Sequence, residues 1–150
     1  EHLAVTGDAA LVGQALAQAL ADKRGIARYG QMLLPMDEAL ALVALDFSGR
    51  GLLVFDAPLP AQKVGTFDAE LTPEFLRALA HNAGMTLHVR LLGGTNTHHI
   101  VEAIFKALGR ALGQATVTLA VGEEWVDDGA RVVAGDDPPD RSGRDYHLSL

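Results

Sequence analysis

The order of helical and extended patterns between residues 8 and 113 constrains the fold more than any other feature. Six segments carry these patterns in turn: 8–21 (helical), 40–47 and 52–56 (extended), 72–84 (helical), 85–92 (extended) and 97–113 (helical). Helices that alternate with strands bury their apolar faces against one sheet. The sequence therefore predicts an α/β fold, a two-layer α+β sandwich with helices packed on one face of a mixed sheet.

The ends of these segments carry local signals. Asp8 is a candidate N-cap for the first helix, and Thr72 followed by Pro73 predicts the start of the second. Gly84 is a predicted helix stop. The string SGRG at 48–51 separates two short apolar runs, which predicts a β-hairpin between them.

Composition narrows the class of protein. The chain has 150 residues, which suits one domain, and it contains no cysteine, which excludes disulfides and thiolate metal sites. A net charge of −7 argues against nucleic-acid binding. No uninterrupted apolar run approaches the roughly 20 residues of a membrane span, so we expect no membrane partner and a cytoplasmic location. Residues 116–150 are acidic and include GDDPPDRSGRD, so we expect a domain over 1–115 and a partly disordered tail over 116–150.

The string THHIVEAIFKALGR begins the last predicted helix. At about 100° per residue, His98, Glu102 and Lys106 form one stripe, with His99 at its edge and the apolar side chains opposite. Two imidazoles and a carboxylate suit a divalent ion such as Mn, Fe or Zn, provided that other elements supply more ligands. The alternative is a solvated helix start with an ordinary Glu102 pair.

Two segments of the chain echo each other. Residues 1–20 and 97–112 both have histidine near their start and continue into an Ala/Leu-rich helix. Such an echo favours an internal duplication, although helices of this composition often look alike.

Several blocks resemble, in order, the imidazoleglycerol-phosphate dehydratase family. They are DKRGIARYG (22–30), PMDEALALVALDFSGR (35–50), VGTFDAELTPEFLRALAHNAGMTLHVRLLGG (64–94) and GGTNTHHIVEAIFKALGRAL (93–112). The resemblance covers roughly residues 1–115. It implies a tandem repeat of a small α/β unit, of the ribosomal-protein-S5-domain-2-like type.

The resemblance also implies an activity. Members of this family are lyases that dehydrate imidazole glycerol phosphate to imidazole acetol phosphate in histidine biosynthesis. They hold the substrate ring as an imidazolate on two Mn ions, which stabilise the negative charge that develops on it. They assemble from trimers into 24 subunits that share sites, so we expect a homo-oligomer here.

Carried over by position, the resemblance assigns metal ligation to His98, His99, Glu102, Glu74 and His2. Glu102 and His99 are also the expected catalytic residues. Without the resemblance, Glu74 would be an ordinary acid on a helix surface.

The resemblance assigns the substrate phosphate to Arg28, Arg50 and Lys106, since guanidinium groups grip phosphate bidentately. From the residues alone, Arg28 would be a loop cation and Arg50 a turn residue.

The chain departs from the family pattern at its first metal motif and at its C-terminal segment. Leu3 stands in place of a histidine, Thr6 stands in place of a glutamate, and residues 116–150 lack the family's Pro-Ser-Thr-Lys-Gly-type segment. The segment that precedes the first motif in the family has no counterpart. We therefore expect a truncated or degenerate member. The alternative function is a non-catalytic relative, a structural or regulatory subunit that keeps the oligomer-forming fold.

Overall fold

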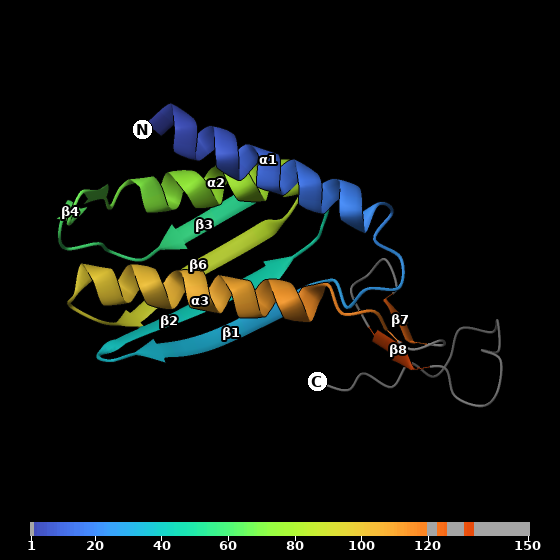
Figure 1. Cartoon of the computed structure of the whole chain (residues 1–150). Coiled ribbons are helices and arrows are strands. Elements are labelled where there is room, and N and C mark those ends of the chain that lie inside the picture. Colours follow the sequence, from blue (N-terminus) through green and yellow to red (C-terminus); the bar gives the residue numbers. More distant parts are fainter. Residues whose placement is uncertain (1, 120–122, 126–130, 134–150) are drawn as a thin grey trace.

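A computed structural model describes residues 2–119, 123–125 and 131–133 (Figure 1). The elements are α1 (His2–Leu20), β1 (Tyr29–Met36), β2 (Ala39–Asp46), β3 (Leu52–Asp56), β4 (Lys63–Val64), β5 (Phe67–Asp68), α2 (Leu71–Ala83), β6 (Thr86–Gly93), α3 (Thr97–Ala115), β7 (Glu123–Trp125) and β8 (Arg131–Val133). All six segments predicted from periodicity are present.

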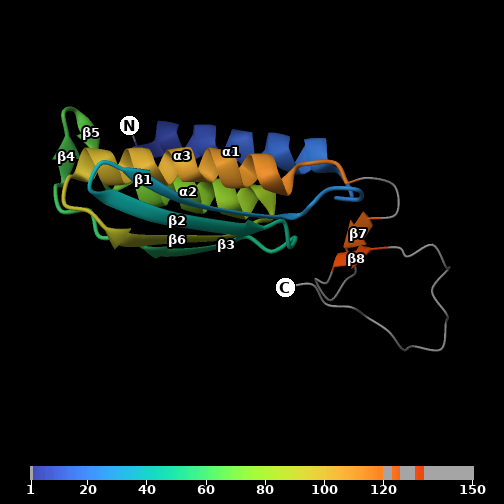
Figure 2. The same cartoon turned by 90° about the horizontal axis from the view of Figure 1, so that it is seen from below.

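The central sheet is mixed and has the strand order β1-β2-β6-β3. The pairs β1–β2 and β2–β6 are antiparallel, while β3 runs parallel to β6. The helices α2 and α3 cover one face of this sheet, as the view from below shows (Figure 2). The predicted fold class, helices on one face of a mixed sheet, is therefore confirmed.

The predicted hairpin between residues 40–47 and 52–56 is wrong. Strand β6 lies between β2 and β3, so the SGRG connection joins two strands that do not pair with each other. β3, α2 and β6 form a βαβ crossover, the connection that parallel strands require. The hairpin partner of β2 is β1, which the sequence analysis missed; its Pro35 is tolerated because β1 is an edge strand.

The core lies between the sheet and α2 and α3. Alternate residues of β2 are buried on the helix side, and they meet a run of buried side chains from α3: Ile100, Ala103, Ile104, Ala107, Leu108 and Ala111. Gly30 of β1 lets α3 approach closely, because a Cβ atom there would lie 1.9 Å from the carbonyl oxygen of Ala111.

The helix starts differ from two of the predicted caps. α1 begins at His2, so Asp8 lies inside the helix, and α2 begins at Leu71 with Glu70 at its N-cap position. Thr72 is buried instead, and its hydroxyl has no hydrogen-bond partner in the described part of the chain. The predicted stop at Gly84 is confirmed, since this residue has a left-handed φ of 63°.

Helix α1 packs against α2 and lies farther from the sheet (Figures 1 and 2). The contact depends on Gly13, because a Cβ atom there would come within 2.8 Å of the Asn82 side chain. Much of the apolar surface of α1 is exposed, including Leu3, Leu11 and Val12. The described residues contain one α/β unit and this additional helix, so the tandem repeat stays a prediction.

The segment Leu3–Leu20 is long and apolar enough to cross a membrane, with a mean hydropathy of 1.2. Length and composition alone are weak evidence, because core helices and signal sequences near an N-terminus meet the same criterion. The expectation that the chain has no membrane partner stays a prediction.

The division into 1–115 and 116–150 also stays a prediction. Thr118 forms a β-bridge with Ile26, and β7 pairs with β8, whereas the predicted disordered stretch 135–145 lies outside the described residues.

Candidate functional site

The start of α3 holds its two histidines in a fixed backbone position. The side chain of Asn96 accepts hydrogen bonds from the backbone N–H groups of His98, at 2.9 Å, and His99, at 3.3 Å. This is an N-cap, which satisfies donors that the first turn of a helix leaves free. The imidazoles therefore project from a capped first turn.

The predicted stripe on α3 is present. The Nε2 atom of His98 lies 3.3 Å from Oε2 of Glu102, and Nζ of Lys106 lies 2.7 Å from Oε1 of Glu102. The hydrogen bond from Lys106 lowers the pKa of Glu102, against a smaller opposing effect of desolvation. Glu102 is therefore a charged oxygen donor at neutral pH.

His99 turns to the other side and meets two carboxylates from the turn between β1 and β2. Its Nδ1 lies 2.7 Å from Oε2 of Glu38, and its Nε2 lies 3.4 Å from Oδ2 of Asp37. The hydrogen bond with Glu38 raises the pKa of His99. That hydrogen bond, together with those from the backbone N–H groups of Asn96 and Thr95, lowers the pKa of Glu38 to about 2. Sequence analysis missed both carboxylates, although their place between two apolar runs was a signal.

These donors do not converge on one point. His98 with Glu102 forms one pair and His99 with Asp37 forms another, and the two imidazole ring centroids are 6.1 Å apart. Within the described ranges, no group of three His, Asp or Glu side chains is arranged to hold a metal ion. The donor types, imidazole nitrogen and carboxylate oxygen, suit Mn²⁺, but further ligands would have to come from outside this set.

The predicted phosphate residues are not together. Arg28 forms a bidentate ion pair with Asp46 at the end of β2, at 2.7 and 3.3 Å, and exposed Arg50 follows the same end of that strand. Lys106 lies on α3 with Glu102. Because β2 rises about 3.3 Å per residue, its two ends, with Arg28 at one and His99 at the other, are roughly 23 Å apart. One chain thus presents two separated clusters.

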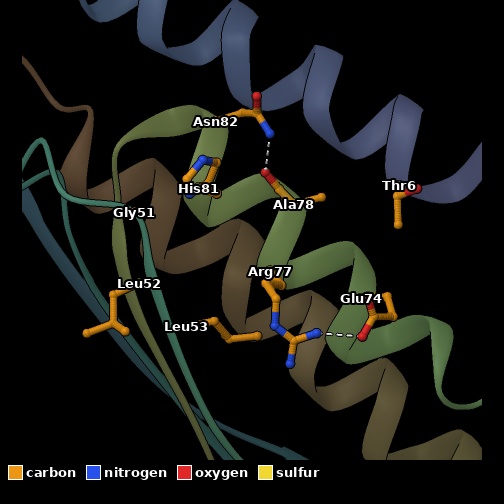
Figure 3. A pocket seen from close by; sticks show the side chains of 9 residues that line it. All are labelled: Thr6, Gly51, Leu52, Leu53, Glu74, Arg77, Ala78, His81 and Asn82. Atoms are coloured by element: carbon orange, nitrogen blue, oxygen red, sulfur yellow. Dashed lines mark hydrogen bonds and ion pairs between the residues drawn. The ribbon is translucent and has the colours of Figure 1, made fainter. Parts of the chain in front are cut away.

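Glu74 lies in a third place, in a cleft of about 470 Å³ between α1, α2 and β3 that also includes Thr6, Arg77 and His81 (Figure 3). It forms an ion pair with Arg77, on the same face of α2. α1 begins at His2, but the side chain of His2 lies outside the described residues. The structure therefore does not bring Glu74 together with His98 or His99.

The fold and the side chains define a class of protein: an α/β chain that presents imidazole and carboxylate donors from a capped helix start. A sequence model of the imidazoleglycerol-phosphate dehydratase family matches residues 1–112. The chain therefore belongs to the imidazoleglycerol-phosphate dehydratase family.

Relatives and solved structures agree with this membership. The imidazoleglycerol-phosphate dehydratase of Desulforamulus reducens is 64% identical over 115 residues, which cover 77% of this chain and 59% of that protein. The one from Desulforudis audaxviator is 59% identical over the same shares. The chain thus spans about three-fifths of the length of these curated relatives.

Among solved structures, the dehydratase from Staphylococcus aureus matches with a TM-score of 0.77 and 49% identity, over 79% of this chain and 69% of that one. The enzyme from Pyrococcus furiosus in complex with (S)-C348 matches with a TM-score of 0.73 and 34% identity, over 85% and 70%.

Proposed function

We propose that this chain takes part in the dehydration of imidazole glycerol phosphate to imidazole acetol phosphate, the step of histidine biosynthesis for which its relatives are named. One observation carries the proposal: the capped start of α3 presents His98, His99 and Glu102 in a chain that is 64% identical to a named dehydratase over 115 residues. The cap orders the backbone that carries these three side chains, so a substrate ring or an ion would bind to donors held in a defined arrangement.

We expect manganese at this helix start. Its donors would be His98 with Glu102 on one side and His99 on the other, and His2 and Glu74 are candidates for further ligands from another copy of the chain. Bound manganese supplies a Lewis acid that stabilises negative charge on an imidazole ring. The separation between the two donor pairs supports more than one ion position.

The residues of the chain itself supply binding and charge. Lys106 holds Glu102 ionised, so that its carboxylate can coordinate or accept a proton near neutral pH. His99 offers its second ring nitrogen, Nε2, on the side of Asp37. Arg28 and Arg50 would hold the substrate phosphate, and Arg28 would then share its guanidinium group between phosphate and Asp46.

A homo-oligomer would reconcile the two separated clusters, because one subunit could place its arginines near the histidines of another. The exposed face of the sheet supports this proposal, since Leu33, Leu52 and Val54 project from it opposite the buried helix side. The mass of the purified chain, measured by light scattering, tests the assembly. We expect a multiple of three subunits, and a monomer would contradict it.

Turnover tests the function. With Mn²⁺ and imidazole glycerol phosphate, the chain should release imidazole acetol phosphate, and His99→Ala should abolish this. Gln18→Ala, which changes an exposed side chain of α1 away from the open sheet face, is the control and should retain activity. Full activity of His99→Ala would contradict the assignment of His99.

The phosphate contact is tested separately. Arg50→Ala should chiefly raise KM through lost phosphate contacts. An unchanged KM would contradict the assignment of Arg50.

A non-catalytic subunit is the second candidate. It is favoured by Leu3, which is 90% exposed where the family has a histidine, and by Thr6, whose hydroxyl bonds to the Leu3 carbonyl. A chain that assembles but holds one Mn ion or none, and that shows no turnover, would support this candidate over the enzyme.

A further inference from the structure

Glu38 is fixed at three points beside the candidate site. Its Oε1 accepts hydrogen bonds from the backbone N–H groups of Asn96, at 2.7 Å, and Thr95, at 3.2 Å. Its Oε2 lies 2.7 Å from Nδ1 of His99. One carboxylate therefore joins the β1–β2 turn, the loop before α3 and the imidazole ring.

The geometry decides which ring nitrogen carries the proton. An ionised carboxylate can only accept hydrogen bonds, so the short contact requires the hydrogen on Nδ1 of His99. In the neutral ring, Nε2 then keeps its lone pair. A metal-bound histidine commonly has this arrangement, in which a carboxylate accepts from the nitrogen that does not coordinate.

We propose that Glu38 is a positioning residue for His99: anchored by the backbone of Thr95 and Asn96, it fixes the ring orientation and directs the lone pair of Nε2 outward to a divalent cation. This inference rests on the proposed metal-dependent function. Asp37 faces the same Nε2 at 3.4 Å and stands where a coordinating oxygen or a cation would approach.

The tautomer of His99 provides a direct test that needs no metal and no activity. ¹⁵N NMR of the histidine side chains, at a pH above their titration, distinguishes a protonated Nδ1 from a protonated Nε2. We expect His99 in the full chain to carry its proton on Nδ1. Free histidine at the same pH, which populates both tautomers, serves as the comparison. A proton on Nε2 of His99 in the unaltered chain would overturn the proposal.

Variants separate positioning from a general effect on the fold. Glu38→Gln has one acceptor oxygen where the carboxylate has two, so it cannot serve both the backbone donors and His99; we expect a mixed tautomer. Asp37→Asn is the matched control in the same turn, and it should leave the proton on Nδ1. If Glu38→Gln keeps the Nδ1 proton fully, or if Asp37→Asn removes it, Glu38 is not what fixes the ring.

Mn²⁺ binding measured by electron paramagnetic resonance completes the test. Loss of a carboxylate that orients a ligating histidine weakens metal binding by about 10- to 100-fold, which is the change expected for Glu38→Gln. Unchanged affinity in that variant would overturn the positioning role. If the unaltered chain has the Nδ1 tautomer but binds no Mn²⁺, the proposed metal function fails while the orientation of His99 by Glu38 stands.

Discussion

Helices α1 and α3 resemble each other in sequence but have different environments. Both are 19 residues long, begin near histidine and are rich in alanine and leucine. α3 has a cap at Asn96 and has eight buried residues, whereas among residues 3–20 of α1 only Ala9 and Gly13 are buried. An Ala/Leu helix is thus stabilised by the surface beneath it more than by its own composition.

The comparison also separates the two histidine motifs. At α3, Glu102 contacts His98 and the turn carboxylates contact His99, while at α1 the corresponding positions are Leu3, which is exposed, and Thr6, which bonds back to its own helix. Among the described side chains at these two helix starts, those of α3 offer imidazole and carboxylate donors, so we expect most of the functional effect of substitutions there.

Core truncation should give the largest difference between the helices. Ile104 of α3 is fully buried, so Ile104→Ala should lower the free energy of unfolding by about 2–5 kcal/mol. Leu11 of α1 is 65% exposed, and Leu11→Ala should change it by about 0.5 kcal/mol or less. Urea unfolding of both variants measures the contrast. Equal losses would show that α1 is packed as firmly as α3.

Two glycines within α1 make a matched pair. Gly13→Ala should destabilise the chain by about 1–3 kcal/mol, because the new methyl group would press on Leu79 and Asn82 of α2. Gly7 has no neighbouring atoms within 4 Å, so Gly7→Ala should stabilise the helix by up to about 1 kcal/mol. Thermal unfolding of the two variants measures whether each substitution lowers or raises stability. A stabilising Gly13→Ala would mean that α1 does not pack on α2 in solution.

Substitution of the cap of α3 should also cost more stability than substitution of the predicted cap of α1. Asn96→Ala removes an acceptor that serves two backbone donors of α3, and it should cost about 1 kcal/mol. Asp8→Ala changes an exposed residue inside α1 and should stay within about 0.5 kcal/mol of the unaltered chain. Chemical unfolding compares them. A larger loss for Asp8→Ala would restore it as the cap of a shorter α1.

The smallest effect is the pH dependence of the Glu38–His99 pair in the metal-free chain. The pKa of Glu38 falls from 4.5 to about 2, so its stabilisation is present above pH 4.5 and is lost as the pH falls toward 2. The pKa of His99 is raised above 6.5, so its stabilisation is present below pH 6.5 and is lost at higher pH.

The pair should therefore stabilise the fold most between pH 4.5 and 6.5. Urea midpoints across this range should show a modest maximum that Glu38→Gln flattens and that added salt reduces, because both side chains are partly exposed. A maximum that persists in Glu38→Gln would assign it to other groups.

Periodicity predicted all the principal helices and three of the four strands of the sheet, because their apolar patterns reflect burial directly. It missed β1, whose polar and apolar residues with Pro35 suit an edge strand, and it misjudged the pairing of β2 with β3. Which strands pair depends on the βαβ crossover through α2, which places β6 between β2 and β3. The apolar pattern of a single segment does not predict this order.

The candidate site was predictable in part for a similar reason. The helical period placed His98, Glu102 and Lys106 in one stripe, as the structure shows. The partners of His99 come from a turn about 60 residues earlier in the chain, beyond the reach of any period. Arg28 and Arg50 are separated from the histidines by the length of β2. A sequence motif does not predict this distance.

The most direct test of the central claim is the amount of Mn²⁺ bound per chain, with and without the α3 donors. We expect the unaltered chain and Gln18→Ala to bind Mn²⁺ equally, and His98→Ala, His99→Ala and Glu102→Ala each to lose most of it. Equal binding by all five proteins, or none by the unaltered chain, would contradict the account.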